Sequence, residues 1–243
     1  RRMPEYFRCH NYQNPEDADH PPWKWTEGVP EYEGDRWSWY RTRPEHHQKF
    51  NAFLSAIRKD SLPWTELYPP ERVLEGWDEE SVLLVDVGGG NGKDITNFAT
   101  AVAGSHTSAR LVLQERVEVV DALAASRSQL PAQVELMAHN FFEANPVHGA
   151  KVYYMHAVIH DWAESKAHEI LVRIREAMKA GYSTLLLFDR VVPERASDWD
   201  VKTAALDINM MCNFAALERS EAQWRSLLEG AGLRYMGYKK VPG

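Results

Sequence analysis

The stretch Val85-Asp86-Val87-Gly88-Gly89-Gly90-Asn91-Gly92 decides the fold of this chain. It continues an apolar run that begins at residue 81, and it opens into a helical pattern over residues 93–102. We therefore predict a strand, a glycine-rich turn and a helix in succession. Glycines let the backbone approach a ligand that any Cβ would push away, and the start of the helix offers free N–H groups. This order favours a nucleotide-type pocket over an ordinary strand-to-helix turn.

An acid beside the turn indicates which ligand the pocket takes. Dinucleotide-binding turns usually read G-x-G-x-x-G and place a pyrophosphate at the helix N-terminus. Here the glycines alternate as Gly88, Gly90 and Gly92, and Asp86 stands just before them. A carboxylate at that place would repel a pyrophosphate, whereas it suits a ligand that carries an ammonium group. The turn therefore favours S-adenosylmethionine (SAM) over NAD.

Length and composition indicate a soluble enzyme. A chain of 243 residues accommodates one large α/β domain, or a domain with an appendage. The hydrophobic content of 44% and the charged content of 26% are ordinary for a globular protein. The net charge of −7, without a basic tract, argues against nucleic acid as a partner.

Cysteine usage and hydropathy bear on location. Cys9 and Cys212 give neither a disulfide framework nor a metal-ligand spacing, so we expect no metal and a reducing compartment. The sequence contains no apolar run of membrane-spanning length and no signal-peptide pattern. A cytoplasmic enzyme without a membrane partner is therefore expected. Because the first residue is Arg1 rather than Met, we also expect a fragment of a longer protein.

Residues 1–75 are predicted to form an irregular arm, with helices, that packs on the main domain. The first 45 residues are rich in proline, which disfavours long helices. They are also rich in tryptophan and tyrosine, whose apolar area argues against disorder. The sequence leaves two alternatives open: the arm covers the mouth of a pocket, or its aromatic residues only attach it to the core. Residues 46–58 read as an amphipathic helix. Its apolar face is expected to comprise Phe50, Phe53, Leu54 and Ile57.

From residue 81 onward, strand and helix patterns alternate. The alternation predicts an α/β fold, namely a doubly wound, mostly parallel, Rossmann-like sheet with helices on both faces. We assign residues 76–243 to this SAM-binding domain, whose ligands bind at the carboxyl ends of the strands. Strands are predicted at residues 82–87, 110–114, 134–137, 151–156, 184–188 and 233–239. Helices are predicted at residues 93–102, 117–130, 163–179, 201–216 and 220–230.

Side chains suited to an adenosyl ligand follow the second and third strands. Glu115 can accept both ribose hydroxyl groups, or it is a solvated surface acid. Asn140 can hydrogen-bond the adenine edge while Phe141 stacks on the adenine face. Alternatively, Asn140 is a turn residue and Phe141 belongs to the core.

A histidine follows the fourth strand. His160 stands where an imidazole can act as a general base, although a lone histidine is more often structural. Asp189 closes the fifth strand, and Glu218 precedes a predicted helix. A carboxylate that accepts a hydrogen bond from one imidazole nitrogen fixes the tautomer and frees the other nitrogen to take a proton. The sequence does not decide whether either acid touches His160.

Four motifs resemble those of a known family. They are residues 86–92, His160-Asp161-Trp162, residues 188–193 and Glu218-Arg219-Ser220. In this order and spacing they resemble the catalytic domain of the plant and fungal small-molecule O-methyltransferases of the caffeic-acid type. These are class I SAM-dependent enzymes, and the chain is nearer the fungal branch. The resemblance covers roughly residues 25–243.

The resemblance implies a role for each matching residue. His156 stands where many plant members carry a Lys that touches the cofactor, Glu115 where an Asp is usual, and Asn140 also where an Asp is usual. The implied cofactor-binding residues are Asp86, Gly88, Gly90, Gly92, Glu115, Asn140, Phe141 and His156. The implied general base is His160, framed by Asp189 and Glu218. The acceptor pocket is expected to draw on Met210, Met211, Asn213, Phe214 and the N-terminal tryptophans.

The implied reaction is methyl transfer from SAM to a phenolic or polyketide-type hydroxyl in secondary metabolism, with S-adenosylhomocysteine as the second product. Two alternatives keep the fold: a SAM-binding pericyclase or dehydratase that does not transfer the methyl group, and a SAM-binding domain without catalysis. Nothing here corresponds to the N-terminal dimerisation domain of the family, and the chain stops after what reads as the penultimate strand. We therefore expect a homodimer for the full-length protein and a monomer or weak dimer for this chain.

Overall fold

The computed structural model describes residues 2–43, 45, 46, 48–50, 52, 62–104, 108–125 and 130–240. The chain forms two compact units. The sheet unit comprises Leu62–Ile159, His168–Asp189 and Leu228–Gly243. The helical unit comprises Arg1–Ser61, His160–Ala167 and Arg190–Leu227. The domain boundary placed after residue 75 stays a prediction.

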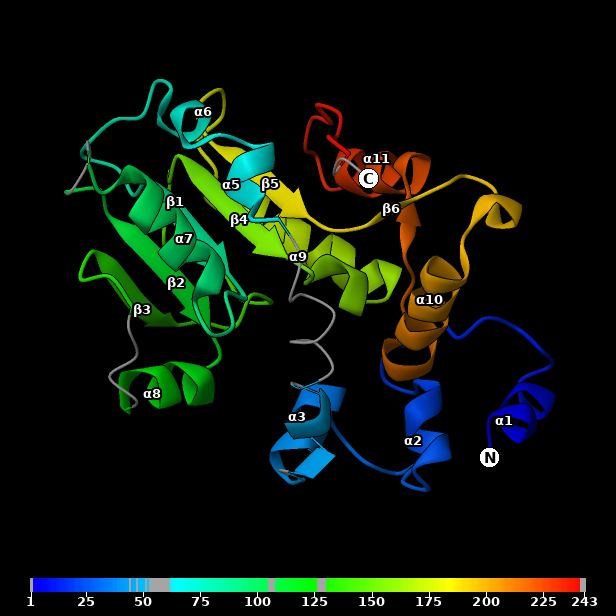
Figure 1. Cartoon of the computed structure of the whole chain (residues 1–243). Helices are drawn as coiled ribbons and strands as arrows, with labels where there is room; N and C mark the ends of the chain where they lie inside the picture. Colours follow the sequence, from blue (N-terminus) through cyan, green and yellow to red (C-terminus); the bar gives the residue numbers. More distant parts are fainter. Residues whose placement is uncertain are drawn as a thin grey trace. The chain divides into compact units, whose positions relative to one another are not determined.

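The sheet unit is built on a parallel five-stranded sheet (Figure 1). The strands lie in the order β3-β2-β1-β4-β5, and every neighbouring pair is parallel. Because the strand order reverses beside β1, the sheet is doubly wound, which confirms the predicted α/β fold. The strands are β1 (Leu84–Val87), β2 (Leu111–Glu115), β3 (Val134–Ala138), β4 (Val152–His156) and β5 (Thr184–Phe188).

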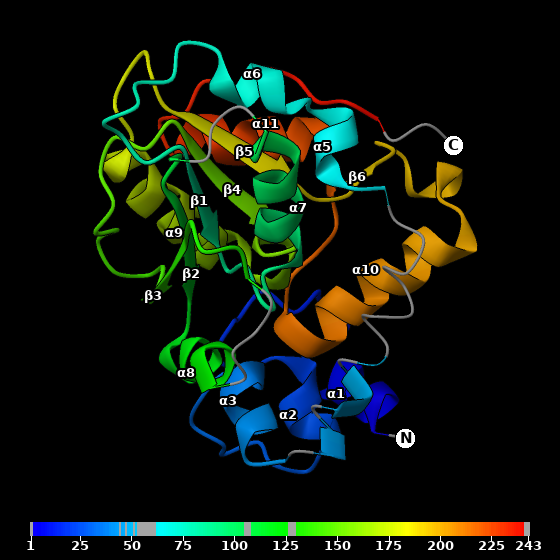
Figure 2. The ribbon, with the colours of Figure 1, turned by 60° about the vertical axis from the view of Figure 1, so that its left-hand side comes forward.

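Helices cover both faces of this sheet. Helix α7 (Lys93–Val102) packs on one face, and the part of α9 (Glu164–Ala177) that belongs to the sheet unit packs on the other (Figure 2). The predicted helix over residues 117–130 is described as far as the end of α8 (Val117–Ala125). The remaining helices with residues in this unit are α5 (Trp64–Leu67), α6 (Pro70–Leu74) and the end of α11 (Glu221–Gly230).

Burial explains why these segments form the sheet. Every residue of β1 is buried, and so are the first four residues of β2 and of β4. Strands buried on both faces read as continuous apolar runs, which is how the sequence predicted them. On the α7 side, the Trp64 ring stacks on Phe98 and Tyr154, with centroid distances of 5.4 and 4.7 Å.

The predicted strand over residues 233–239 is wrong. This segment runs as coil, and most of its residues are exposed. A strand needs a partner with which to form a ladder of hydrogen bonds, and no strand of the described residues pairs with it. At its end, Lys239 Nζ donates a hydrogen bond to the Leu67 carbonyl over 3.0 Å.

The helical unit contains short N-terminal helices and one long helix, α10 (Val201–Phe214). The N-terminal helices are α1 (Met3–Cys9), α2 (Pro22–Thr26) and α3 (Arg36–Arg41), as short as the prolines predict. A two-stranded parallel ladder, β6 (Val191–Val192) with β7 (Arg219–Ser220), was not predicted. The unit also includes the short 3₁₀ helices η1, which begins at Ile159 of the sheet unit and ends at Asp161, and η2 (Ala196–Asp198).

Aromatic residues form the interior of the N-terminal segment. Trp23, Trp39 and Tyr40 make a buried cluster, and Trp37 stacks on Phe214 of α10 with a centroid distance of 5.7 Å. These contacts agree with the expectation that the aromatic residues are ordered. The predicted helix over residues 46–58 falls largely outside the described residues, including Phe53, Leu54 and Ile57. Among the described helices, none is long and apolar enough to cross a membrane.

Candidate functional site

The glycine-rich turn lies at the carboxyl end of β1. Gly88, Gly90 and Gly92 all have positive φ angles, of 73°, 56° and 76°, which L-residues with a side chain rarely adopt. A Cβ at Gly88 would lie 2.9 Å from Val158, so this glycine is required by packing. A Cβ at Gly90 would meet nothing within 4 Å. Gly90 therefore faces open space, as expected of a backbone that a ligand approaches closely.

Asp86 lies beneath this turn rather than on its ligand face. It is 2% exposed, and a Cβ on Gly89 would lie 2.8 Å from its Oδ2 atom. One carboxylate oxygen accepts the N–H of Ile95 in α7, whereas Oδ2 has no hydrogen-bond partner in the described part of the chain. Burial and the nearby carboxylates of Asp94 and Glu115 raise the pKa of Asp86 well above its ordinary value. Any influence of Asp86 on a ligand acts from below the turn.

Glu115, at the end of β2, comes together with the glycine turn. Its carboxylate accepts the N–H of Gly90 and the N–H of Arg116, the latter over 2.7 Å. Burial raises the pKa of Glu115 above its usual value. Placed against Gly90, this carboxylate is positioned to accept hydrogen bonds from a ligand held at the turn.

His156, at the end of β4, is paired with an acid of the same region. Its Nδ1 atom lies 2.6 Å from Oδ2 of Asp94, in the first turn of α7. The imidazole also packs on Phe188, with a centroid distance of 4.5 Å. Local sequence pattern did not predict this histidine–aspartate pair, since its members lie far apart in the chain.

Asn140 and Phe141 follow β3 in a tight turn. The Asn140 side chain accepts the N–H of Phe142 over 3.3 Å and donates to Glu143 over 3.3 Å. These local bonds are typical of a turn asparagine. Phe141 meets Phe142 edge to face at 5.1 Å. A contact of either side chain with adenine stays a prediction.

His160 and Glu218 are brought together within the helical unit. His160 lies in η1, and its Nδ1 atom is 3.2 Å from Oε1 of Glu218. Its Nε2 atom is 3.5 Å from Oδ1 of Asp161, which is too long for a good hydrogen bond. The Glu218 side chain is 2% exposed, and that of His160 is 18% exposed. Asp189 follows β5 and belongs to the sheet unit, whereas His160 belongs to the helical unit. The pairing of Asp189 with His160 therefore stays a prediction.

Two residues that the sequence did not single out hold this pair. Asp207 of α10 accepts the backbone N–H of Glu218 over 2.9 Å, and burial raises the pKa of this aspartate. Arg219 is fully buried and donates through Nη2 to the carbonyl of Trp162 over 3.1 Å. Its Nε and Nη2 atoms also donate to Glu164, over 3.1 and 3.0 Å. Arg219 belongs to the motif Glu218-Arg219-Ser220, whereas nothing in the sequence pattern marked Asp207 as a residue of the site.

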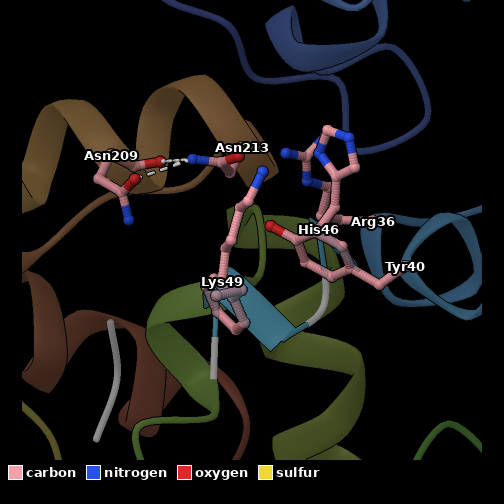
Figure 3. A pocket seen from close by; sticks show the side chains of 7 residues that line it. Arg36, Tyr40, His46, Lys49, Asn209 and Asn213 are labelled. Atoms are coloured by element: carbon pink, nitrogen blue, oxygen red, sulfur yellow. Dashed lines mark hydrogen bonds between the residues drawn. The ribbon is translucent and has the colours of Figure 1, made fainter. Parts of the chain in front are cut away.

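The four predicted acceptor residues separate into core and cavity. Met210 and Phe214 are buried and pack with Trp37, and Met211 is half-buried. Asn213 borders a cavity of about 350 Å³ within the helical unit (Figure 3). The side chains labelled around it are Arg36, Tyr40, His46, Lys49, Asn209 and Asn213. The cavity is thus more polar than the apolar pocket that the sequence led us to expect.

Comparison with known proteins gives the family. The model of the O-methyltransferase domain matches residues 22–234. The chain belongs to the O-methyltransferase family. It is 36% identical over 241 residues to the O-methyltransferase mfmE of Annulohypoxylon moriforme, with 99% of this chain and 57% of mfmE covered. This O-methyltransferase domain therefore spans little more than half the length of that relative, and the resemblance seen in its motifs is confirmed.

Solved structures agree with this assignment. The structure of LepI in complex with SAM has a TM-score of 0.82 and 28% identity, and the match covers 96% of the O-methyltransferase chain and 57% of LepI. A structure described as a pericyclic reaction enzyme has a TM-score of 0.81 and 28% identity over the same shares.

Proposed function

We propose that this protein transfers the methyl group of SAM to a phenolic or polyketide-type hydroxyl, with His160 as the general base. Membership of the O-methyltransferase family supports the reaction class. The observation that carries the proposal is the contact of His160 Nδ1 with the buried Glu218 carboxylate. A histidine held in this way by a carboxylate is prepared to take a proton on its other nitrogen.

The residues of the turn fit SAM. The open space at Gly90 admits close approach of a ligand, and the Glu115 carboxylate beside it suits ribose hydroxyl groups. The buried carboxyl of Asp86 lies beneath Gly89, so in this proposal it supports the turn from below. We assign the cofactor to Asp86, Gly88, Gly90, Gly92, Glu115, Asn140, Phe141 and His156. When bound, SAM supplies an activated methyl group.

The chain itself positions the acceptor and removes its proton. In this proposal, Nε2 of His160 takes the proton of the acceptor hydroxyl while Nδ1–H donates to Glu218. The carboxylates of Glu218 and Asp161 stabilise the imidazolium that forms. Asp207 and Arg219 keep this arrangement rigid, because each is bonded to the segment that carries Glu218 or His160. General-base catalysis of this kind contributes about 10²–10⁴-fold to the rate.

A methyl-transfer assay tests the proposal. The protein is incubated with SAM labelled in its methyl group and a panel of phenols and aromatic polyketides. Label in an acceptor product is expected. The likeness to a pericyclic reaction enzyme favours a second candidate, in which SAM is bound but its methyl group is kept. SAM binding by calorimetry, together with conversion of an acceptor that gains no label, would replace the first candidate with the second.

A matched pair of glycine substitutions tests the cofactor turn. Gly90 and Gly181 both have positive φ, of 56° and 74°, and a Cβ at either would meet nothing within 4 Å. We expect Gly90→Ala and Gly181→Ala to lose similar stability, about 1–2 kcal/mol, because both residues stay left-handed. Only Gly90→Ala is expected to weaken SAM binding, by tenfold or more, since its Cβ would occupy ligand space. Calorimetric titration with SAM measures this, and equal affinity in both variants would contradict the assignment of the turn.

A further inference from the structure

The cavity of the helical unit concentrates basic side chains in a chain whose net charge is −7. Arg36, His46 and Lys49 line it from the N-terminal segment, and Asn209 and Asn213 line it from α10 (Figure 3). Among the described residues that line this cavity, none carries a carboxylate. A concave site with basic walls attracts a ligand that carries negative charge.

The positive charge of Arg36 is buried and only partly compensated. Arg36 is 8% exposed, and its guanidinium carbon lies 4.5–4.7 Å from the ring centroids of Trp23, Trp39 and Tyr40. Its ion pair with Glu27 is long, with 3.9 Å between Nη2 and Oε1. Nε and Nη1 have no hydrogen-bond partner within the described part of the chain. The aromatic rings hold the cation, but they leave its charge available to raise the potential of the cavity.

Lys49 and Asn209 provide groups that an anion can contact. Lys49 is exposed, and its side chain points toward Asn213 (Figure 3). No ion pair of Lys49 occurs among the residues that the structure describes. Asn213 Nδ2 donates to Asn209 Oδ1 over 2.9 Å, which orients the Asn209 amide so that its own N–H groups remain as donors. An ammonium group and an amide N–H are the donors that a carboxylate accepts.

Aromatic rings complete the cavity. Tyr40 stacks on Phe50 with a centroid distance of 5.1 Å and an interplanar angle of 26°, and both residues line the same space. A volume of about 350 Å³ lies in the range of small-molecule sites. Stacked rings beside basic groups suit a planar ligand with one acidic end.

We propose that this cavity binds the acceptor substrate, and that the acceptor is a planar aromatic acid rather than a neutral phenol. Lys49 and Asn209 contact the carboxylate, Arg36 strengthens the positive potential from behind, and Tyr40 and Phe50 hold the ring. The inference rests on the proposed function, since it assigns the cavity to the acceptor of that methyl transfer. The inference narrows the class of acceptor substrates from phenols in general to aromatic acids.

A pair of probes that differ in charge tests this inference. We choose 6-hydroxy-2-naphthoic acid and its primary amide, which share a ring system and differ at the acidic end. Calorimetric titration of the protein at low ionic strength is expected to show the acid bound about tenfold more tightly than the amide. Lys49→Met is expected to remove most of this preference, whereas Lys49→Arg, which keeps the charge, retains it. Lys202→Met, a substitution of an exposed lysine of α10 outside the cavity lining, is the control for net charge.

Two results would overturn the inference. One is equal affinity of the wild-type protein for the acid and the amide. The other is a Lys49→Met variant that prefers the acid over the amide by the same ratio of affinities as the wild type and Lys202→Met. The methyl-transfer assay separates this inference from the proposed function. If methyl transfer to the amide is as fast as to the acid, only the inference of an acidic acceptor is overturned. If the acid binds more tightly but no acceptor is methylated, the methyltransferase proposal is overturned and the preference for an anion stands.

Discussion

Replacement of His160 by Gln is expected to lower kcat for methyl transfer by about 10²–10⁴-fold, the contribution of a positioned general base. A glutamine side chain retains hydrogen-bonding capacity but cannot accept the proton at neutral pH. SAM affinity is expected to stay unchanged, because the turn residues assigned to the cofactor are intact. Transfer from labelled SAM measures kcat, and calorimetry measures SAM affinity.

Two further variants sharpen this prediction. Glu218→Gln keeps the shape of the carboxylate beside Nδ1 but removes its charge, so the imidazolium loses its nearest stabilising partner. We expect kcat to fall by about tenfold or more. His168→Gln is the control, because His168 is exposed and its Nε2 atom contacts the Gly230 carbonyl over 3.1 Å. Equal rates in wild type and His160→Gln would remove His160 as the base.

The sheet could be predicted because its strands are buried. Three strands, over residues 84–87, 111–115 and 152–156, lie largely in the interior. Their sequences are therefore mostly apolar, and the local pattern identifies them. Residues 233–239 show the limit of that method. A strand forms only where another strand supplies a ladder of hydrogen bonds. The presence of such a partner is a property of the tertiary structure that local sequence pattern does not contain.

The site could be predicted in part, for a similar reason. The resemblance implied that Asp189 and Glu218 both frame His160, but the sequence did not decide whether either acid touches it. In the structure, Glu218 lies 3.2 Å from Nδ1 of His160 within the helical unit. The burial of Asp86 beneath Gly89 could not be predicted from the sequence either, because the direction of this side chain depends on how the turn folds over it.

The basic cavity was missed because its parts lie far apart in the chain. Arg36 and Lys49 come from the N-terminal segment, and Asn209 and Asn213 come from α10. Asn213 was expected in the acceptor pocket, yet nothing in the sequence gave a reason to place a distant lysine beside it. Met210 and Phe214, which were expected beside Asn213, instead pack into the core with Trp37. Neighbouring residues on a helix point to different sides, so one motif supplies both core and cavity.

Replacement of Glu164 by Ala is expected to lower the free energy of unfolding by about 3 kcal/mol, because it removes a carboxylate from the fully buried guanidinium of Arg219. This is the lower end of the range for a broken buried pair. The Glu164 side chain is 60% exposed, and the Trp162 carbonyl still accepts from Arg219. Urea denaturation followed by tryptophan fluorescence measures the loss.

The control for this prediction lies on the same helix. Glu176 pairs with Arg173 over 3.2 Å, and the two side chains are 46% and 38% exposed. Glu176→Ala is expected to cost less than about 1 kcal/mol, as usual for a surface ion pair. Since Arg219 also bonds the segment that carries His160, Glu164→Ala is expected to lower kcat as well, whereas Glu176→Ala leaves it unchanged. Equal losses of stability in the two variants would show that the ion pair with Glu164 does not stabilise the buried Arg219 guanidinium. The other contacts of Arg219 would then have to hold the segment that carries His160.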